Sequence, residues 1–199
     1  MYQIPRFVPE LTNKIMALKL ASVSMVRFLF LFVIYYILLM IPSTCGTSDS
    51  DLSWICSLTQ NDEHCKQLLL SDPRTNSSDP PLISLISIEL AHKQATYNLG
   101  EFTGYRDNST DPSLGKLFGN CTEMYQAIVY DLDKVYGLSK QGDYKGVLNE
   151  GTPTKEVYDC ENDLPPSLPT MAITEDMLLA LETLSGVASY VVYKTSRHP

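Results

Sequence analysis

The spacing of hydrophobic residues predicts a long amphipathic helix from about residue 80 to Arg106. Its apolar side chains recur with a period near 3.6 residues, the spacing of one helix face. Asp79 is a candidate N-cap, and Pro80 and Pro81 suit a first turn. The apolar positions assigned to this face are Leu82, Leu85, Ile86, Leu90 and Tyr97.

The same pattern is clearest in a second long helix, which begins at Pro112 behind the candidate cap Asp111 and continues to about Leu138. Its apolar residues form one continuous stripe along the helix, so we expect the side that carries this stripe to be buried. The stripe consists of Leu114, Leu117, Phe118, Cys121, Tyr125, Ile128, Val129, Leu132, Val135 and Tyr136.

A third helical segment, residues 143–163, is interrupted by Gly146, Gly151 and Pro153. A proline inside a helix costs about 3 kcal/mol, so we expect a kink or two short helices. A last helix is predicted behind Thr174 as N-cap, with Glu175 in its first turn. Its apolar face is Met177, Leu178, Leu181, Leu184, Val187, Ala188 and Val191.

Two short helical pieces are predicted between Asp51 and Ser71, on either side of Asn61 and Asp62. Their inward-facing residues are predicted to be Trp54, Ile55 and Leu58 on the first piece and Leu68, Leu69 and Leu70 on the second. A linker rich in turn residues follows, and nothing indicates a strand. The pattern thus predicts an all-α fold: a short N-terminal helical hairpin with its linker (47–79), then an up-and-down four-helix bundle (80–199), together one domain.

The N-terminal 46 residues change the picture, because they have the pattern of a secretory signal with an N-terminal extension. Arg27 precedes an unbroken apolar run of 14 residues, 28–41, and small residues follow as far as Gly46. A bilayer-spanning helix needs about 20 residues, which makes an uncleaved signal anchor the weaker alternative. We therefore expect a secreted protein that has no membrane segment once the signal is removed.

Charge argues against a nucleic-acid partner. The whole chain has a formal net charge of −8. Residues 1–46 carry four basic residues and one acidic residue, so the remainder carries 11 basic and 22 acidic residues, a net charge of −11. Phosphate binding needs clustered lysine and arginine, and no such stripe exists in the sequence.

The cysteines also suit the secretory route. Cys45 leaves with the signal, and an even number remains, which in a secreted chain favours disulfides. The remaining four are Cys56, Cys65, Cys121 and Cys160. Three sequons predict glycosylation at Asn76, Asn108 and Asn120.

A metal site is the competing explanation for the polar stretch between Cys56 and Cys65, because His64 lies beside it. The spacing lacks the close cysteine pairs of structural zinc sites, and His92, the other candidate, lies on a polar part of its helix. No catalytic motif is present, so the sequence predicts no enzyme, metal or cofactor. Disulfides between consecutive cysteines suit two antiparallel turns, although crossed pairings remain formally possible.

Several short motifs resemble the plant invertase and pectin methylesterase inhibitor family over about residues 52–193. They are Cys-x8-Cys in the hairpin, Asp-Pro after it, Ala91 and Ala95 in a long helix, Asn-Cys-Thr-Glu-Met-Tyr from Asn120, and Tyr-Asp-Cys-Glu from Tyr158. The resemblance implies a four-helix bundle behind a hairpin, disulfides joining the first cysteine to the second and the third to the fourth, and non-covalent inhibition of a cell-wall enzyme.

The resulting hypothesis is a secreted, apoplastic inhibitor of invertase or pectin methylesterase that docks over the enzyme's active-site cleft. The resemblance suggests docking through the second and third bundle helices, where Tyr130, Asp133 and Tyr144 are candidate contacts. Two features depart from the family: the interrupted third helix, and residues 162–165 where glycine and phenylalanine are usual. The alternatives are a bundle that keeps the fold without inhibitory activity and a helical ligand carrier.

Overall fold

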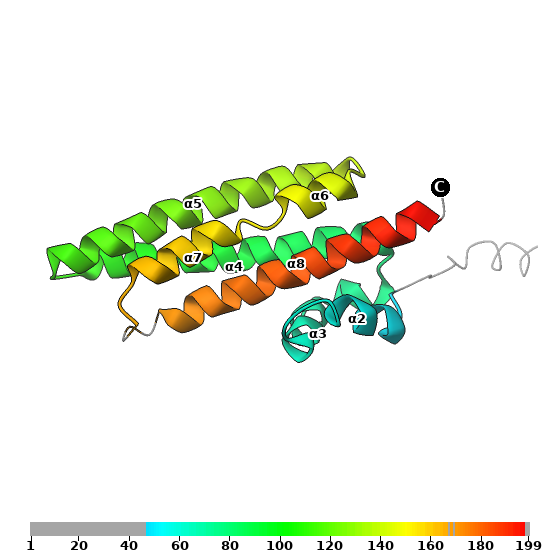
Figure 1. Ribbon diagram of the computed structural model, residues 1–199, viewed down its shortest axis with the longest axis horizontal. Coiled ribbons are helices and arrows are strands. Elements are labelled where there is room, and N and C mark those ends of the chain that lie inside the picture. The colour runs from blue at the N-terminus through cyan, green and yellow to red at the C-terminus, as the bar shows by residue number, and fades with distance from the viewer. Residues whose placement is uncertain (1–46, 167, 169, 198–199) are drawn as a thin grey trace, which may run out of the picture. The chain divides into compact units, whose positions relative to one another are not determined.

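A computed structural model describes residues 47–166, 168 and 170–197 (Figure 1). These residues form helices and loops without a strand, which confirms the predicted all-α class. The predicted signal, residues 1–46, lies outside the described part. The elements are α2 (Asp49–Cys56), α3 (Asp62–Leu70), a 3-10 helix η1 (Pro73–Ser77), α4 (Pro80–Asn108), α5 (Pro112–Lys140), α6 (Tyr144–Glu150), α7 (Thr154–Asp163) and α8 (Met171–Arg197).

The helices form an up-and-down bundle in which α6 and α7 together take the place of a third long helix. Figure 1 shows α6 and α7 following one another beside α5, while α4 and α8 complete the bundle. The hairpin of α2 and α3 packs against α8, and α3 also contacts α4. Both the bundle and the hairpin were predicted from sequence.

Side-chain caps start the two longest helices where the sequence predicted. Asp79 accepts a hydrogen bond from the Leu82 backbone N–H at 2.9 Å, and Asp111 accepts one from Ser113 at 2.8 Å. The prediction for the last helix was wrong. It begins at Met171, and Thr174 lies inside its first turn with its hydroxyl donating to the Met171 carbonyl.

The break in the third helix lies at Gly151, the C-cap of α6, which is buried between α6 and α7. A Cβ atom there would lie 2.3 Å from the backbone oxygen of Val147, far inside contact distance. Pro153 then stands at the N-cap position of α7. Two short helices were one of the two outcomes expected from the sequence.

The bundle core fixes the register of α4 against α5. The rings of Phe102 and Tyr125 lie 5.1 Å apart between centroids. The buried Asn98 amide donates to the Tyr125 hydroxyl at 3.2 Å and to the Ile173 carbonyl of α8 at 2.8 Å. Ala91 and Ala95 are also buried here. Tyr97 is not: it is 58% exposed, so its predicted place on the apolar face was wrong.

A second cluster of buried side chains holds the hairpin to the bundle, with Ile55 and Leu69 completely buried. Three predicted inward-facing residues are exposed instead: Trp54 by 37%, Leu58 by 51% and Leu70 by 47%. The Trp54 ring packs against two tyrosine rings of α8, with its centroid 5.4 Å from that of Tyr190 and 5.3 Å from that of Tyr193. The short hairpin helices therefore bury a narrower stripe than the sequence pattern suggested.

Two disulfides brace the hairpin and the bundle separately. Cys56–Cys65 joins α2 to α3 with Cα atoms 5.5 Å apart, and Cys121–Cys160 joins α5 to α7 at 4.9 Å. This is the predicted consecutive pairing, and it rules out the crossed alternatives.

Candidate functional site

The outer side of α5 carries the most exposed large hydrophobic side chain among the described residues. Tyr130 is 72% exposed, and Asp133 follows one turn later on the same side of the helix. The next residue, Lys134, pairs with Glu150 of α6, and this hydrogen bond raises the pKa of Lys134. Tyr130, Asp133 and Lys134 therefore all lie on the outward side of α5.

A groove of about 340 Å³ lies between α4 and α5. Two apolar residues of its lining, Ile88 and Leu132, are almost completely buried beneath it. His92 of α4 and Asp133 of α5 meet across it, with Nε2 and Oδ1 3.3 Å apart. The lining consists of Ile88, Glu89, His92, Lys93, Leu132, Asp133 and Tyr136.

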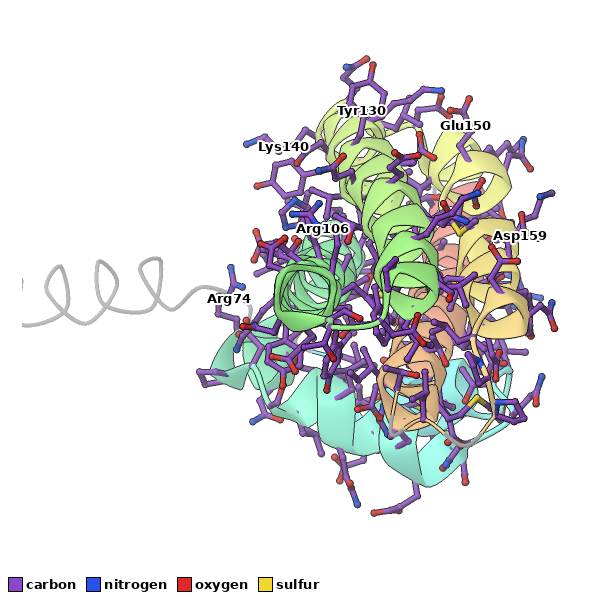
Figure 2. The ribbon with its side chains drawn as sticks, turned by 90° about the vertical axis from the view of Figure 1, so that its left-hand side faces the viewer. Arg74, Arg106, Tyr130, Lys140, Glu150 and Asp159 are labelled. Carbon is purple, nitrogen blue, oxygen red and sulfur yellow. A yellow bond between two sulfur atoms is a disulfide. The ribbon has the colours of Figure 1, made fainter. Side chains whose placement is uncertain are left out.

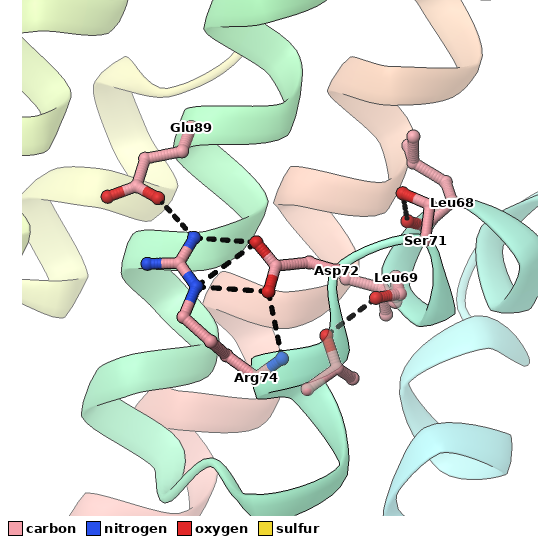
Figure 3. A network of polar contacts seen from close by, with 7 residues as sticks. Leu68, Leu69, Ser71, Asp72, Arg74 and Glu89 are labelled. Carbon is pink, nitrogen blue, oxygen red and sulfur yellow. Dashed lines mark hydrogen bonds and ion pairs between the residues drawn. The ribbon is translucent and has the colours of Figure 1, made fainter.

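One rim of this groove is held by an ion network from the segment before α4 (Figure 3). The Arg74 guanidinium contacts Asp72 at 2.6 Å and Glu89 at 2.5 Å. The hydrogen bonds with Arg74 lower the pKa of Asp72, and those with Asp72 and Glu89 raise the pKa of Arg74. Glu89 is therefore oriented by a cation of its own chain.

Charged side chains stand on both sides of the bundle, and most of them are paired with an opposite charge beside them. Figure 2 shows Arg74, Arg106 and Lys140 on one side, Glu150 and Asp159 on the other, and Tyr130 at the crest between them. Helix α7 carries one basic and four acidic residues. A partner that covered α7 would therefore face a predominantly acidic surface.

Tyr144, the third candidate contact, has different neighbours from Asp133. It is half-buried and packs against the hydrophobic cluster that holds the hairpin. Burial, and to a smaller extent Asp79, raises the pKa of Tyr144. The structure thus places Tyr130 and Asp133 together on α5 and sets Tyr144 apart on α6.

The described residues contain no group of three or more His, Cys, Asp or Glu side chains able to hold a metal ion. Cys56, Cys65, Cys121 and Cys160 are all oxidised, which removes them as thiolate nucleophiles or ligands. None of the helices in the described part of the chain is long and apolar enough to cross a membrane.

The three sequons differ in their surroundings. Asn76 is exposed on η1, and Asn108 is exposed as the last residue of α4. Asn120 is half-buried within α5 beside Cys121, and the hydroxyl of its sequon residue Thr122 is buried and donates to the Phe118 carbonyl. Glycosylation stays a prediction at all three, and the surroundings favour Asn76 and Asn108.

Sequence reasoning missed the α4 side of the groove. His92 was considered only as a metal ligand, and Glu89 and Lys93 were given no role. The available signal was the recurrence of Glu89, His92 and Lys93 at spacings of three and four on one long helix, which places them side by side.

Comparison with known proteins identifies the family to which this chain is similar. Residues 50–165 match the family described as plant invertase/pectin methylesterase inhibitor. The chain is 28% identical over 131 residues to a pectinesterase inhibitor of Actinidia deliciosa, covering 64% of this chain and 71% of the relative. It is also 28% identical over 147 residues to the cell wall / vacuolar inhibitor of fructosidase 1 of Arabidopsis thaliana, covering 71% of this chain and 67% of the relative.

A crystal structure of a mutant form of a pectin methylesterase inhibitor from Arabidopsis shares the fold. It superimposes with a TM-score of 0.63 over 70% of this chain and 95% of the other, at 16% identity.

Proposed function

Because the chain belongs to the plant invertase/pectin methylesterase inhibitor family, we propose that it is a secreted protein that inhibits a cell-wall carbohydrate enzyme by non-covalent docking. The family match over residues 50–165 is the observation that carries this proposal. Inhibition by docking needs no catalytic group, and it suits a bundle whose outer helices are braced by a disulfide.

The proposed docking surface runs over α5 and the α6–α7 pair. Tyr130 supplies exposed aromatic area of the kind that anchors protein interfaces, and Asp133 lies beside it. Tyr144 is at most a peripheral contact, because its half-buried ring packs against the cluster that holds the hairpin. An interface of this kind depends on salt and pH, because α7 is acidic.

The proposed target is pectin methylesterase or acid invertase. Of the two relatives described above, one is named as an inhibitor of pectinesterase and the other as an inhibitor of fructosidase. Titration of the secreted protein against both enzymes between pH 4 and 7 decides between them. We expect saturable, reversible, one-to-one inhibition of one enzyme at micromolar inhibitor or below, and weaker inhibition after Tyr130→Ala.

Absence of inhibition of both enzymes across that range would leave a bundle that keeps the fold without the activity. A ligand carrier is disfavoured because large side chains fill the bundle core, among them Tyr125, Phe102 and Leu132. In secretion, the proposed mature protein begins near Thr47 and carries glycan at Asn76 or Asn108.

A further inference from the structure

We propose that Asn108 is the sequon asparagine that accepts a glycan in the folded protein, whereas Asn76 and Asn120 accept one only before their segments fold. The donor is an oligosaccharide carried on a lipid diphosphate. The chain meets this donor only if it enters the secretory route, so the assignment rests on the proposed function for its setting. The asparagines themselves differ little in exposure, and the difference lies in the hydroxyl of each sequon.

The sequon of Asn108 is open at both of its functional groups. A sequon consists of an asparagine and a hydroxyl residue two positions later, and the transferase has to reach both. Asn108 and Thr110 are both exposed. Helix α4 ends at Asn108, and Ser109 has an extended backbone with φ −72° and ψ 125°. The amide and the hydroxyl are therefore presented together on the turn between α4 and α5.

The sequon of Asn76 has an exposed asparagine and a buried hydroxyl. Ser78 is completely buried, and its hydroxyl donates to the Thr75 carbonyl at 2.9 Å. The Thr47 hydroxyl lies 3.0 Å from that of Ser78 and donates to the Ser78 carbonyl at 2.7 Å. Because Thr47 is 31 positions away, this contact forms only when the start of the hairpin closes onto the segment before α4. Folding thus removes the Ser78 hydroxyl from reach.

The sequon of Asn120 is closed by its helix. Residues two positions apart on a helix do not face the same way, so Asn120 and Thr122 are not presented together. Thr122 is 2% exposed, and its hydroxyl donates to the Phe118 carbonyl at 2.8 Å. Cys121, between them, is bonded to Cys160 of α7. Access to this sequon requires α5 to unwind where a disulfide holds it.

Glycan transfer at Asn108 leaves the end of α4 intact. The Asn108 Nδ2 forms a bond to C1 of the donor's first sugar, and the C1–O bond to the diphosphate breaks. The lipid diphosphate leaves with that electron pair, and the amide gives up one of its two protons. Nδ2 donates to the Gly104 carbonyl at 2.8 Å, and the proton that stays on the nitrogen is enough for one hydrogen bond.

The test compares folded and unfolded chains as acceptors. The full-length chain is made by cell-free translation without membranes, oxidised, and incubated with solubilised oligosaccharyltransferase and its lipid-linked donor. Non-reducing peptide mapping verifies the Cys121–Cys160 bond and measures glycan at each asparagine. We expect transfer at Asn108 to be at least about tenfold faster than at Asn76 or Asn120, because those two sites wait for a local opening of the fold. The reduced, unfolded chain is expected to accept glycan at all three.

Two substitutions in the same turn locate the effect. Thr110→Ala removes the hydroxyl of the Asn108 sequon and is expected to abolish transfer there. Ser109→Ala is the control, because it changes the neighbouring residue and keeps the sequon, so transfer is expected to be unchanged. Equal rates at Asn108 and Asn120 in the folded chain, or no transfer at Asn108, would overturn the assignment.

Expression of the full-length chain in a eukaryotic secretory host separates this assignment from the proposed function. We expect glycan at Asn108 on most molecules and at Asn76 and Asn120 on a smaller fraction. Transfer at Asn108 in the cell-free assay, with no glycan on the chain made in the host, would contradict the secretory route and support the acceptor site. A glycan carried by more molecules at Asn76 or Asn120 than at Asn108 would count against the acceptor site itself.

Discussion

At the scale of single residues, Asn98 is the polar group on which three helices of the bundle converge. It is completely buried in α4, donates to the Tyr125 hydroxyl of α5 and the Ile173 carbonyl of α8, and accepts from Gln94 at 2.9 Å. Burial raises the pKa of Tyr125, so its hydroxyl stays neutral throughout the physiological range. A buried polar group with all its partners fixes one helix register where apolar packing alone tolerates several.

Asn98→Ala is therefore expected to lower the free energy of unfolding by about 2 kcal/mol, because it leaves the Tyr125 hydroxyl without this bond and opens a small cavity. Urea denaturation measures the change. Gln94→Ala is the control: it removes a partner on the helix surface and is expected to cost less than about 0.5 kcal/mol. Equal losses in both variants would contradict the central role of Asn98.

Residues whose role is local were predictable, and those whose role depends on a distant partner were not. Asp79 and Asp111 cap their helices through backbone atoms two or three positions away, which the sequence displays directly. Trp54 was placed inward because it is large and apolar, but its partners Tyr190 and Tyr193 are more than 130 positions away. Thr174 had the right neighbours for a cap, and the helix simply begins one turn earlier.

At the scale of elements, the third position of the bundle shows how one glycine permits a change of helix direction. Gly151 is buried where the α6 backbone passes close to it, and no larger residue fits without movement of Val147. Gly137 of α5 is the opposite case, because a Cβ atom there would meet nothing within 4 Å.

Gly151→Ala is expected to lower the free energy of unfolding by about 1–3 kcal/mol, the usual cost of overpacking. Gly137→Ala, the same chemical change in an open position of the last turn of α5, is expected to raise it by about 0.5 kcal/mol. Thermal and urea unfolding of the two variants measure both changes. A loss in both would show that the effect is not the close contact with Val147.

The candidate site was partly predictable at this scale. Tyr130 and Asp133 lie on the helix with the clearest periodicity, so their common exposed face followed from the sequence. The groove did not, because it needs the register of α4 against α5. That register is set by core contacts such as Phe102 against Tyr125, and helix periodicity contains no information about which turn of one helix meets which turn of another.

At the scale of the whole molecule, the described residues join two separately braced parts, the hairpin and the bundle. Gly186 of α8 allows close approach, since a Cβ atom there would lie 3.0 Å from the Ile55 carbonyl of α2. An ion pair between Asp51 of α2 and Lys194 of α8 spans the same interface at 2.9 Å. Burial pushes the pKa of Asp51 upward, but hydrogen bonds from Lys194 and Ser48 outweigh it and leave the pKa lowered.

Because the pKa of Asp51 is lower in the folded protein, its carboxylate stabilises the fold at pH values above 3.8, its ordinary pKa. This stabilisation is lost as the pH falls through the lowered pKa of the folded state. Asp51→Asn is therefore expected to lower the free energy of unfolding at pH 7 by about 0.5–1 kcal/mol, with the gap closing near pH 2. Urea unfolding at both pH values measures it.

Asp49→Asn serves as the control, because it removes a charge from the same first turn of α2. The difference between the two variants separates the contacts that Asp51 makes with Lys194 and Ser48 from the effect of the helix dipole. An Asp51→Asn gap that persisted unchanged at pH 2 would mean that the ion pair is not its cause.

The Cys121–Cys160 disulfide affects how the protein responds to proteolytic cleavage. Both the turn after α5 and the break between α6 and α7, residues 151–153, lie inside the stretch of chain that this bond closes. After a single cleavage at either place, the disulfide between α5 and α7 still joins the two fragments covalently. The outer helices then stay side by side after a cut that would release half of an unbridged bundle, so a nicked molecule still presents its Tyr130 face.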